Sequence, residues 1–120
     1  MMLRSPLFWL LPTSASAASL LVSHYNGNLY SLSLNGGKLS ISSQVKACGG
    51  MPSWLELDSG SKTVYCTDES GATGGSTLTA LSVSDSGAMK VSATAKSPGG
   101  EVHAGLYGGS NGKGFLAVAE

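Results

Sequence analysis

The chain has 120 residues, a formal net charge of zero and only 12% charged residues. A length of this size suggests one domain. Without a basic patch we expect no nucleic-acid partner, and without a Lys/Arg-rich amphipathic run we expect no binding to a membrane. The hydrophobic content of 42% is too high for a disordered chain and fits half-buried strands.

The first 17 residues have the pattern of a secretory signal peptide. Arg4 supplies the positive charge, residues 7–11 form a short apolar core, and small residues over 13–17 end in an Ala-x-Ala cleavage pattern. The apolar run is far shorter than the roughly 20 residues of a spanning helix. We expect cleavage near Ala17, a mature chain from residue 18 and a secreted protein. The alternative is an N-terminal strand or amphipathic helix, against which two flanking prolines argue.

Secretion affects how the two cysteines are interpreted. Cys48 and Cys66 are the only pair, and an oxidising compartment permits a disulfide between them. The alternative is two free thiols, one in a loop and one buried on a strand. The Cα separation decides between these alternatives, and a sequence does not contain it.

From residue 18 onward the sequence predicts strands separated by turns. Asn26-Gly27 is a strong hairpin signal, and residues 28–34 alternate strictly between the two faces of a strand. No later segment has helical periodicity longer than a turn, so the chain is predicted to be all-β. The expected strands cover residues 20–25, 28–34, 38–46, 53–57, 63–68, 76–84, 89–96, 102–107 and 114–119.

A repeat of about fifty residues groups these strands. Residues 46–55 recur loosely at 96–105, with paired glycines in the same place, and residues 61–69 recur at 112–120 one residue out of register. A period of this length filled with short strands is typical of β-propeller blades. The sequence therefore predicts a partial β-propeller of about two to two and a half blades, with nine strands grouped as three, four and two.

Only the middle group has the four strands of a whole blade. The first group lacks its innermost strand, and the last group has only its two inner strands. Open blades expose sheet faces and strand edges. We therefore expect the chain alone to be marginally stable, aggregation-prone or dependent on self-association through open blade edges. The end at 117–120 falls within a strand, and we expect a gene-model or splicing choice as its origin.

The ordered strands, the segment 62–69 after a Ser-Gly turn and the segment 99–108 together resemble the lactonase family of seven-bladed β-propellers. This family includes 6-phosphogluconolactonase and carboxy-cis,cis-muconate cyclase, and the resemblance over residues 19–119 is closest to secreted fungal members. The resemblance implies that the chain is the N-terminal third of an enzyme. This enzyme would hydrolyse or form the ring of a sugar lactone or muconolactone without an organic cofactor.

The resemblance also implies limits on activity. The family's suspected catalytic residues lie mainly in later blades and have no counterpart here, and residues 18–120 contain no Arg to clamp a carboxylate or phosphate. We expect the isolated chain to be inactive, with a small-molecule lactone or organic acid as the partner of the full-length relative. The alternative is a non-enzymatic binding or scaffold module that self-associates.

Two loops between blades, residues 47–52 and 97–101, are predicted to lie around the channel mouth. His103 follows the second loop, and an imidazole there can act as a general base or polarise a lactone carbonyl. Glu101 shares its strand face if the backbone is extended, so His103 and Glu101 are the candidate catalytic residues. The alternative to a catalytic His103 is a histidine that hydrogen-bonds a neighbouring blade's backbone. The paired glycines at 49/50 and 99/100 also have two interpretations, a backbone-lined rim around a ligand or simple turns repeated in each blade.

The remaining sequence offers little other chemistry. We expect His24 to pack at the surface or between blades, and the two histidines have no metal-ligand spacing. The sequence contains no nucleophile elbow, Walker loop or dinucleotide fingerprint. We therefore expect no metal and no cofactor. Trp54 has two interpretations, stacking on a sugar-like ring or filling the space between blades.

Overall fold

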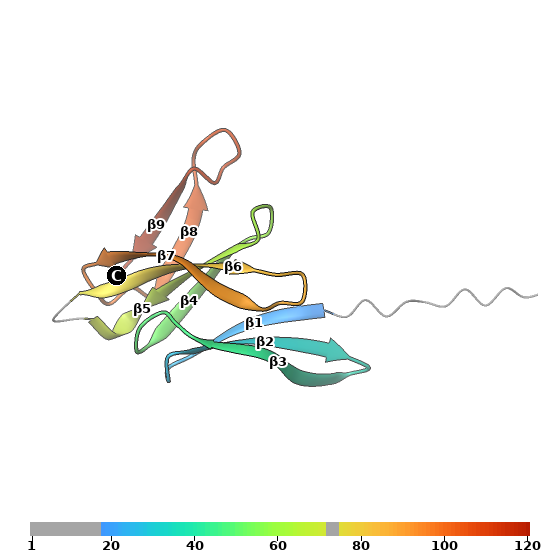
Figure 1. Cartoon of the computed structure of the whole chain (residues 1–120). Helices are drawn as coiled ribbons and strands as arrows, with labels where there is room; N and C mark the ends of the chain where they lie inside the picture. The colour runs from blue at the N-terminus through green and yellow to red at the C-terminus, as the bar shows by residue number, and fades with distance from the viewer. Residues whose placement is uncertain (1–17, 72–74) are drawn as a thin grey trace, which may run out of the picture.

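The computed structural model describes residues 18–71 and 75–120, and the predicted signal peptide lies outside this range. The strands form antiparallel sheets in the orders β1-β2-β3, β4-β5-β6-β7 and β8-β9 (Figure 1). Within the described ranges, the single-turn 3-10 helix η1 (Glu69–Gly71) is the only helical element, and no helix is long and apolar enough to cross a membrane. The strands are β1 (Ala18–His24), β2 (Asn28–Asn35), β3 (Lys38–Lys46), β4 (Pro52–Asp58), β5 (Thr63–Asp68), β6 (Ser76–Val83), β7 (Met89–Ser97), β8 (His103–Tyr107) and β9 (Phe115–Ala119).

These sheets confirm the predicted all-β fold. Each expected strand is present with ends within two residues of the prediction, and the strands divide into three, four and two as the repeat indicated. The polar strand β3 lies at the edge of its sheet. The sheets stack as blades, with β4–β7 between β1–β3 on one side and β8–β9 on the other (Figure 1).

The stacking depends on tight turns at one end of the strands. Gly27 has a φ of 83°, which other residues rarely adopt, and a Cβ there would lie 2.9 Å from the carbonyl oxygen of Gly49. The Gly27 carbonyl in turn accepts a hydrogen bond from the Ala47 amide at 3.1 Å. The β1–β2 turn is therefore fixed against the loop that leads into the second blade.

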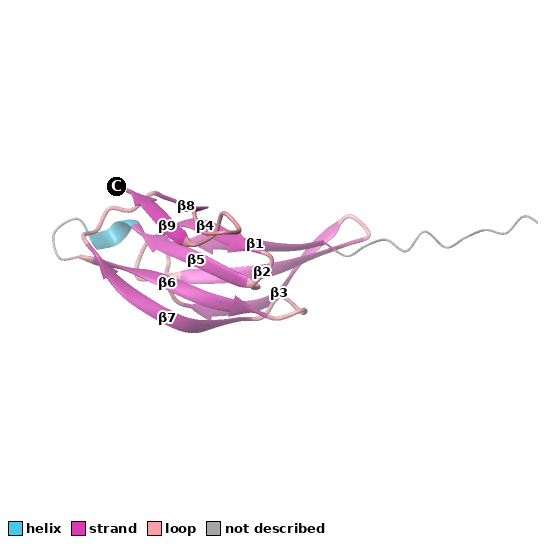
Figure 2. Ribbon diagram, turned by 90° about the horizontal axis from the view of Figure 1, so that it is seen from above, coloured by secondary structure: helices cyan, strands magenta, loops and turns pink. Residues whose placement is uncertain are grey.

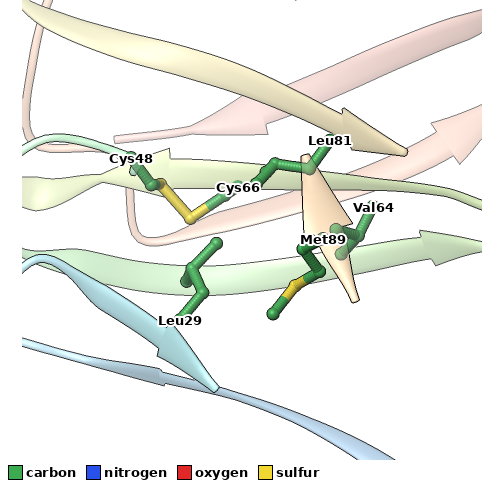
Figure 3. Packing of buried hydrophobic residues seen from close by; sticks show 6 residues of the cluster. All are labelled: Leu29, Cys48, Val64, Cys66, Leu81 and Met89. Carbon is green, nitrogen blue, oxygen red and sulfur yellow. A yellow bond between two sulfur atoms is a disulfide. The ribbon is translucent and has the colours of Figure 1, made fainter. Parts of the chain in front are cut away.

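The hydrophobic core lies between the β1–β3 and β4–β7 sheets (Figure 3). Leu29 on β2 is fully buried and packs with Val64 and Leu81 of the second sheet, which are also fully buried. Burying one such side chain stabilises the fold by about 1.5–3 kcal/mol. This apolar contact is what holds the first blade on the second.

A disulfide between Cys48 and Cys66 belongs to the same core (Figure 3). The two Cα atoms lie 5.9 Å apart, and the bond joins the loop between blades to the middle of β5. Cys48 has a φ of 70°, an uncommon value for a residue other than glycine. The structure therefore contains the disulfide rather than two free thiols, and the bond holds the loop in this conformation.

Lys113, in the β8–β9 loop, bonds Asp58 at the end of β4 and so ties the last hairpin to the second blade. Asp58 also accepts hydrogen bonds from Ser61 Oγ and the Gly60 amide. Mainly through the hydrogen bond from Lys113, and then that from Ser61, the pKa of Asp58 falls to about 2.

Replacing both cysteines (Cys48→Ser with Cys66→Ser) should lower the free energy of unfolding by about 3 kcal/mol, because the unfolded chain regains the freedom of the closed loop. Urea unfolding followed by circular dichroism measures the loss. Reductant should destabilise the original chain and leave the double variant unchanged. Equal stability of the two proteins without reductant would contradict the structural role of the bond.

Acid should weaken the ion pair between Asp58 and Lys113. The folded pKa of about 2 lies below the ordinary value of 3.8, so the unfolded state binds more protons between these values. The stabilisation is complete above about pH 4 and is lost as the pH falls through 2. The stability difference between the original chain and Asp58→Asn, measured by urea unfolding from pH 2 to 6, should shrink toward acid. A difference that is constant with pH would refute this assignment.

Candidate active site

Several loops meet at one end of the stacked sheets. The Glu69 amide of η1 donates to the Met51 carbonyl at 3.0 Å, and Tyr25 Oη donates to the Glu69 carboxylate at 2.7 Å. Gly99 has a φ of 115°, and a Cβ there would overlap the backbone of Gly71. Both predicted loops between blades therefore lie at this end of the sheets, together with the β1–β2 turn and η1. We call this end the rim.

Asp68 anchors the first of these loops. Its side chain is 4% exposed and accepts hydrogen bonds from the Met51 amide at 3.0 Å, the Ser70 amide at 3.1 Å and Ser70 Oγ at 2.7 Å. Burial acts to raise the pKa of Asp68, but the hydrogen bonds from Ser70 and Met51 outweigh it and leave the pKa below its ordinary value. A Cβ on Gly49 would overlap this carboxylate, so glycine is required at that position.

Glu101 anchors the second loop in a similar way. Its side chain is 2% exposed, and its carboxylate accepts hydrogen bonds from Ser76 Oγ and, at 3.0 Å, from the Gly99 amide. Burial acts to raise its pKa, but the hydrogen bonds from Ser76, Ser97 and Gly99 keep the pKa below its ordinary value. Its backbone carbonyl accepts from Ser53 Oγ at 2.6 Å. Glu101 therefore binds the loop to both β4 and β6.

His103 is the first residue of β8, and its side chain is exposed. Its ring lies on that of Trp54 in β4, with ring centroids 4.2 Å apart and planes tilted by 43°. β4 and β8 are the first strands of adjacent sheets, which places the two rings beside the rim. An exposed imidazole beside an indole face can exchange protons and can also contact a ligand ring.

Glu101 and His103 were expected to share a strand face if the backbone at Glu101 is extended, and the structure does not bring them together in this way. Glu101 precedes the strand instead of sharing its face, and its carboxylate turns toward Ser76 and Gly99. Within residues 18–71 and 75–120, no hydrogen bond joins it to His103. Trp54 is the partner that sequence reasoning missed. A signal existed, because the repeat places Trp54 and His103 near the start of equivalent inner strands.

The other predicted residues have structural contacts. His24 Nδ1 accepts a hydrogen bond from the Asn26 amide at 3.1 Å, which places it in the β1–β2 turn.

Next to Glu101, a pocket of about 230 Å³ is lined by Asp68, Ser76, Ser97 and Lys96. Among the described residues, no group of three or more His, Cys, Asp or Glu side chains is placed to hold a metal ion.

Comparison with known sequences gives one finding. The sequence profile of a family described as "Lactonase, 7-bladed beta-propeller" matches residues 19–120. Neither the curated proteins nor the solved structures yielded a match. Of the described strands β1–β9, the match leaves out only the first residue of β1.

Replacement of Glu101 by Gln should destabilise the chain by about 1–3 kcal/mol, because a buried charged acceptor is lost and its donors are left poorly paired. His103→Ala should have a much smaller effect on stability, since His103 is exposed. Urea unfolding of the two variants shows which of the two side chains anchors the structure. Unchanged stability of Glu101→Gln would show that the carboxylate does not anchor the loop.

Proposed function

The chain belongs to the lactonase family of seven-bladed β-propellers, and on this premise we propose that it forms part of a propeller acting on a lactone, with His103 as a substrate contact. The observation that carries the proposal is the exposed His103–Trp54 pair on neighbouring inner strands beside the rim. We propose a sugar lactone or a muconolactone as the substrate class. Both are small oxygen-rich rings with one face that can lie against an indole.

The proposed chemistry assigns different roles to His103, Trp54 and Glu101. In lactone hydrolysis, water adds to the acyl carbon, the ring C–O bond breaks, and the released alkoxide takes up a proton. We propose that His103 accepts the proton of the water and returns it to the alkoxide. Trp54 positions the imidazole, and Glu101 positions the loop before it. The reverse sequence of steps closes a lactone ring.

We propose that the isolated chain is inactive. The two buried carboxylates near this rim, Asp68 and Glu101, are occupied by hydrogen bonds from Ser70, Met51, Ser76 and Gly99. His103 thus lacks an acid partner among the described residues, and Lys96 is the cation of the nearby pocket. General acid–base catalysis typically contributes 10²- to 10⁴-fold and needs groups in hydrogen-bond reach. Binding without turnover is therefore the expected behaviour.

We further propose that the protein is secreted. The pattern of residues 1–17 supports this localisation. The disulfide between Cys48 and Cys66 also supports it, because such bonds form and persist mainly in oxidising compartments.

Fluorescence of Trp54 tests the substrate contact. The sequence contains two tryptophans, and Trp9 lies in the predicted signal peptide, so a chain of residues 18–120 has Trp54 as its only one. Titration of this chain with glucono-1,5-lactone should change the emission, and His103→Ala should weaken binding about fivefold, as for the loss of one hydrogen bond. His24→Ala, which changes the other histidine, should bind as well as the parent. Equal binding with and without His103 would reject the assignment.

A further inference from the structure

The chain contains three Asn-Gly pairs, at residues 26–27, 35–36 and 111–112, and each lies in or beside a turn between strands. In such a pair the asparagine side chain reacts readily with the next backbone nitrogen, because glycine has no Cβ to hinder the attack. The reaction replaces the side-chain amide by a carboxylate. The three pairs share this chemistry, so their surroundings in the fold determine which of them reacts.

The pair at residues 26–27 is held by its neighbours. The Gly27 amide, which would be the attacking group, donates a hydrogen bond to the His24 carbonyl at 3.0 Å. Asn26 Oδ1 accepts a hydrogen bond from the Asn28 amide at 3.0 Å, and Asn26 Nδ2 donates to Tyr30 Oη at 3.3 Å. Gly27 is also buried. Ring closure at Asn26 therefore breaks three hydrogen bonds and moves a buried residue.

The pair at residues 111–112 is held more loosely. Asn111 Oδ1 accepts a hydrogen bond from the Lys113 amide at 3.0 Å. The ammonium of Lys113 is bonded to Asp58, which limits the movement of this loop. The space around Gly112 is open, since a Cβ there would meet no atom within 4 Å. Ring closure at Asn111 therefore breaks one hydrogen bond in a loop that is fixed at its next residue.

The pair at residues 35–36 has neither restraint. Asn35 ends β2, and Gly36 and Gly37 form a two-residue turn with φ values of 56° and 77°. Positive φ at both positions is typical of a type I′ hairpin, whose strand ends, here Asn35 and Lys38, pair with each other. Within the described residues, no hydrogen bond engages the Asn35 side chain or the Gly36 amide. The reacting groups are therefore both available.

The β2–β3 turn also has room to move. It projects past the β4–β7 sheet (Figure 2). Asn35 is exposed, and a Cβ built on Gly36 or Gly37 would meet no atom within 4 Å. The turn can therefore bring the Asn35 side chain toward the Gly36 nitrogen without disturbing a packed contact.

We propose that Asn35 is the site at which the folded chain undergoes spontaneous deamidation, while Asn26 is protected by its hydrogen bonds. The Gly36 nitrogen gives its proton to water and attacks Cγ of Asn35, which closes a five-membered succinimide ring. The NH2 group takes up a proton from water and leaves as ammonia. Water then adds to one of the ring carbonyls and breaks its C–N bond. The product is aspartate or isoaspartate, and in both cases a carboxylate replaces a neutral amide.

The fold tolerates this new charge. The strand register places Asn35 directly opposite Lys38. Opposite charges at paired positions of an antiparallel sheet stabilise it, so a carboxylate at position 35 faces a favourable partner. The modified chain also carries one more negative charge than the original, whose formal net charge is zero. The two forms are therefore separable by ion exchange in the folded state.

The experiment is peptide mapping by mass spectrometry of the full chain, sampled during incubation at neutral pH. The three Asn-Gly pairs of one sample serve as controls for one another. Each hydrogen bond that must break slows ring closure about fivefold. Asn35 should therefore lose its amide about fivefold faster than Asn111 and at least about tenfold faster than Asn26.

The same measurement on the unfolded chain separates the effect of the fold from that of the dipeptide. In guanidinium chloride with reductant, the three pairs should react at similar rates, because each asparagine is followed by glycine. In the folded chain, Asn35→Gln should remove the fast reaction, since the longer side chain does not close a five-membered ring. Asn26→Gln is the matched control and should leave the fast reaction unchanged.

The comparison within the original chain requires no variant, so the proposal stays testable if Asn35→Gln does not fold. A folded chain in which Asn26 or Asn111 reacts as fast as Asn35 would overturn the proposal. So would a folded chain that retains the Asn35 amide over the time in which the unfolded chain loses it.

Discussion

The structure depends on the contact between the β1–β3 and β4–β7 sheets. The strands of these sheets alternate so that both faces carry apolar side chains, and each face is stable only when another sheet covers it. Leu29, Val64, Leu81 and the disulfide provide this cover on one side of the second sheet. The other features of the molecule follow from how much of each remaining face is covered.

On its second face the β4–β7 sheet is covered only in part. The last hairpin lies over β4 and β5. It is held at one end by the hydrogen bond from Ser53 to the Glu101 carbonyl and at the other end by the ion pair between Lys113 and Asp58. This attachment brings His103 onto Trp54 and also leaves an alanine-lined groove over β6 and β7. The candidate site and the open surface are therefore two consequences of one placement.

The sequence predicted the fold well because its signals are patterns that can be read along the chain. Alternation fixed the strand faces, Asn26-Gly27 fixed a turn, and the fifty-residue repeat fixed the grouping of strands. The site depends on contacts between segments about fifty residues apart, which alternation does not encode. Glu101 was expected to share a strand face with His103 only if its backbone was extended, but Gly99 and Gly100 have positive φ values in the loop before it, and its carboxylate meets Ser76. The disulfide was undecided for the same reason, since it depends on a separation in space.

Hydrogen exchange of backbone amides across the β4–β7 sheet tests the central claim, that cover by neighbouring sheets determines stability. Amides bonded between β4 and β5, which are covered on both faces, should exchange more slowly than those bonded between β6 and β7. Uniform protection of all four strands would contradict the account.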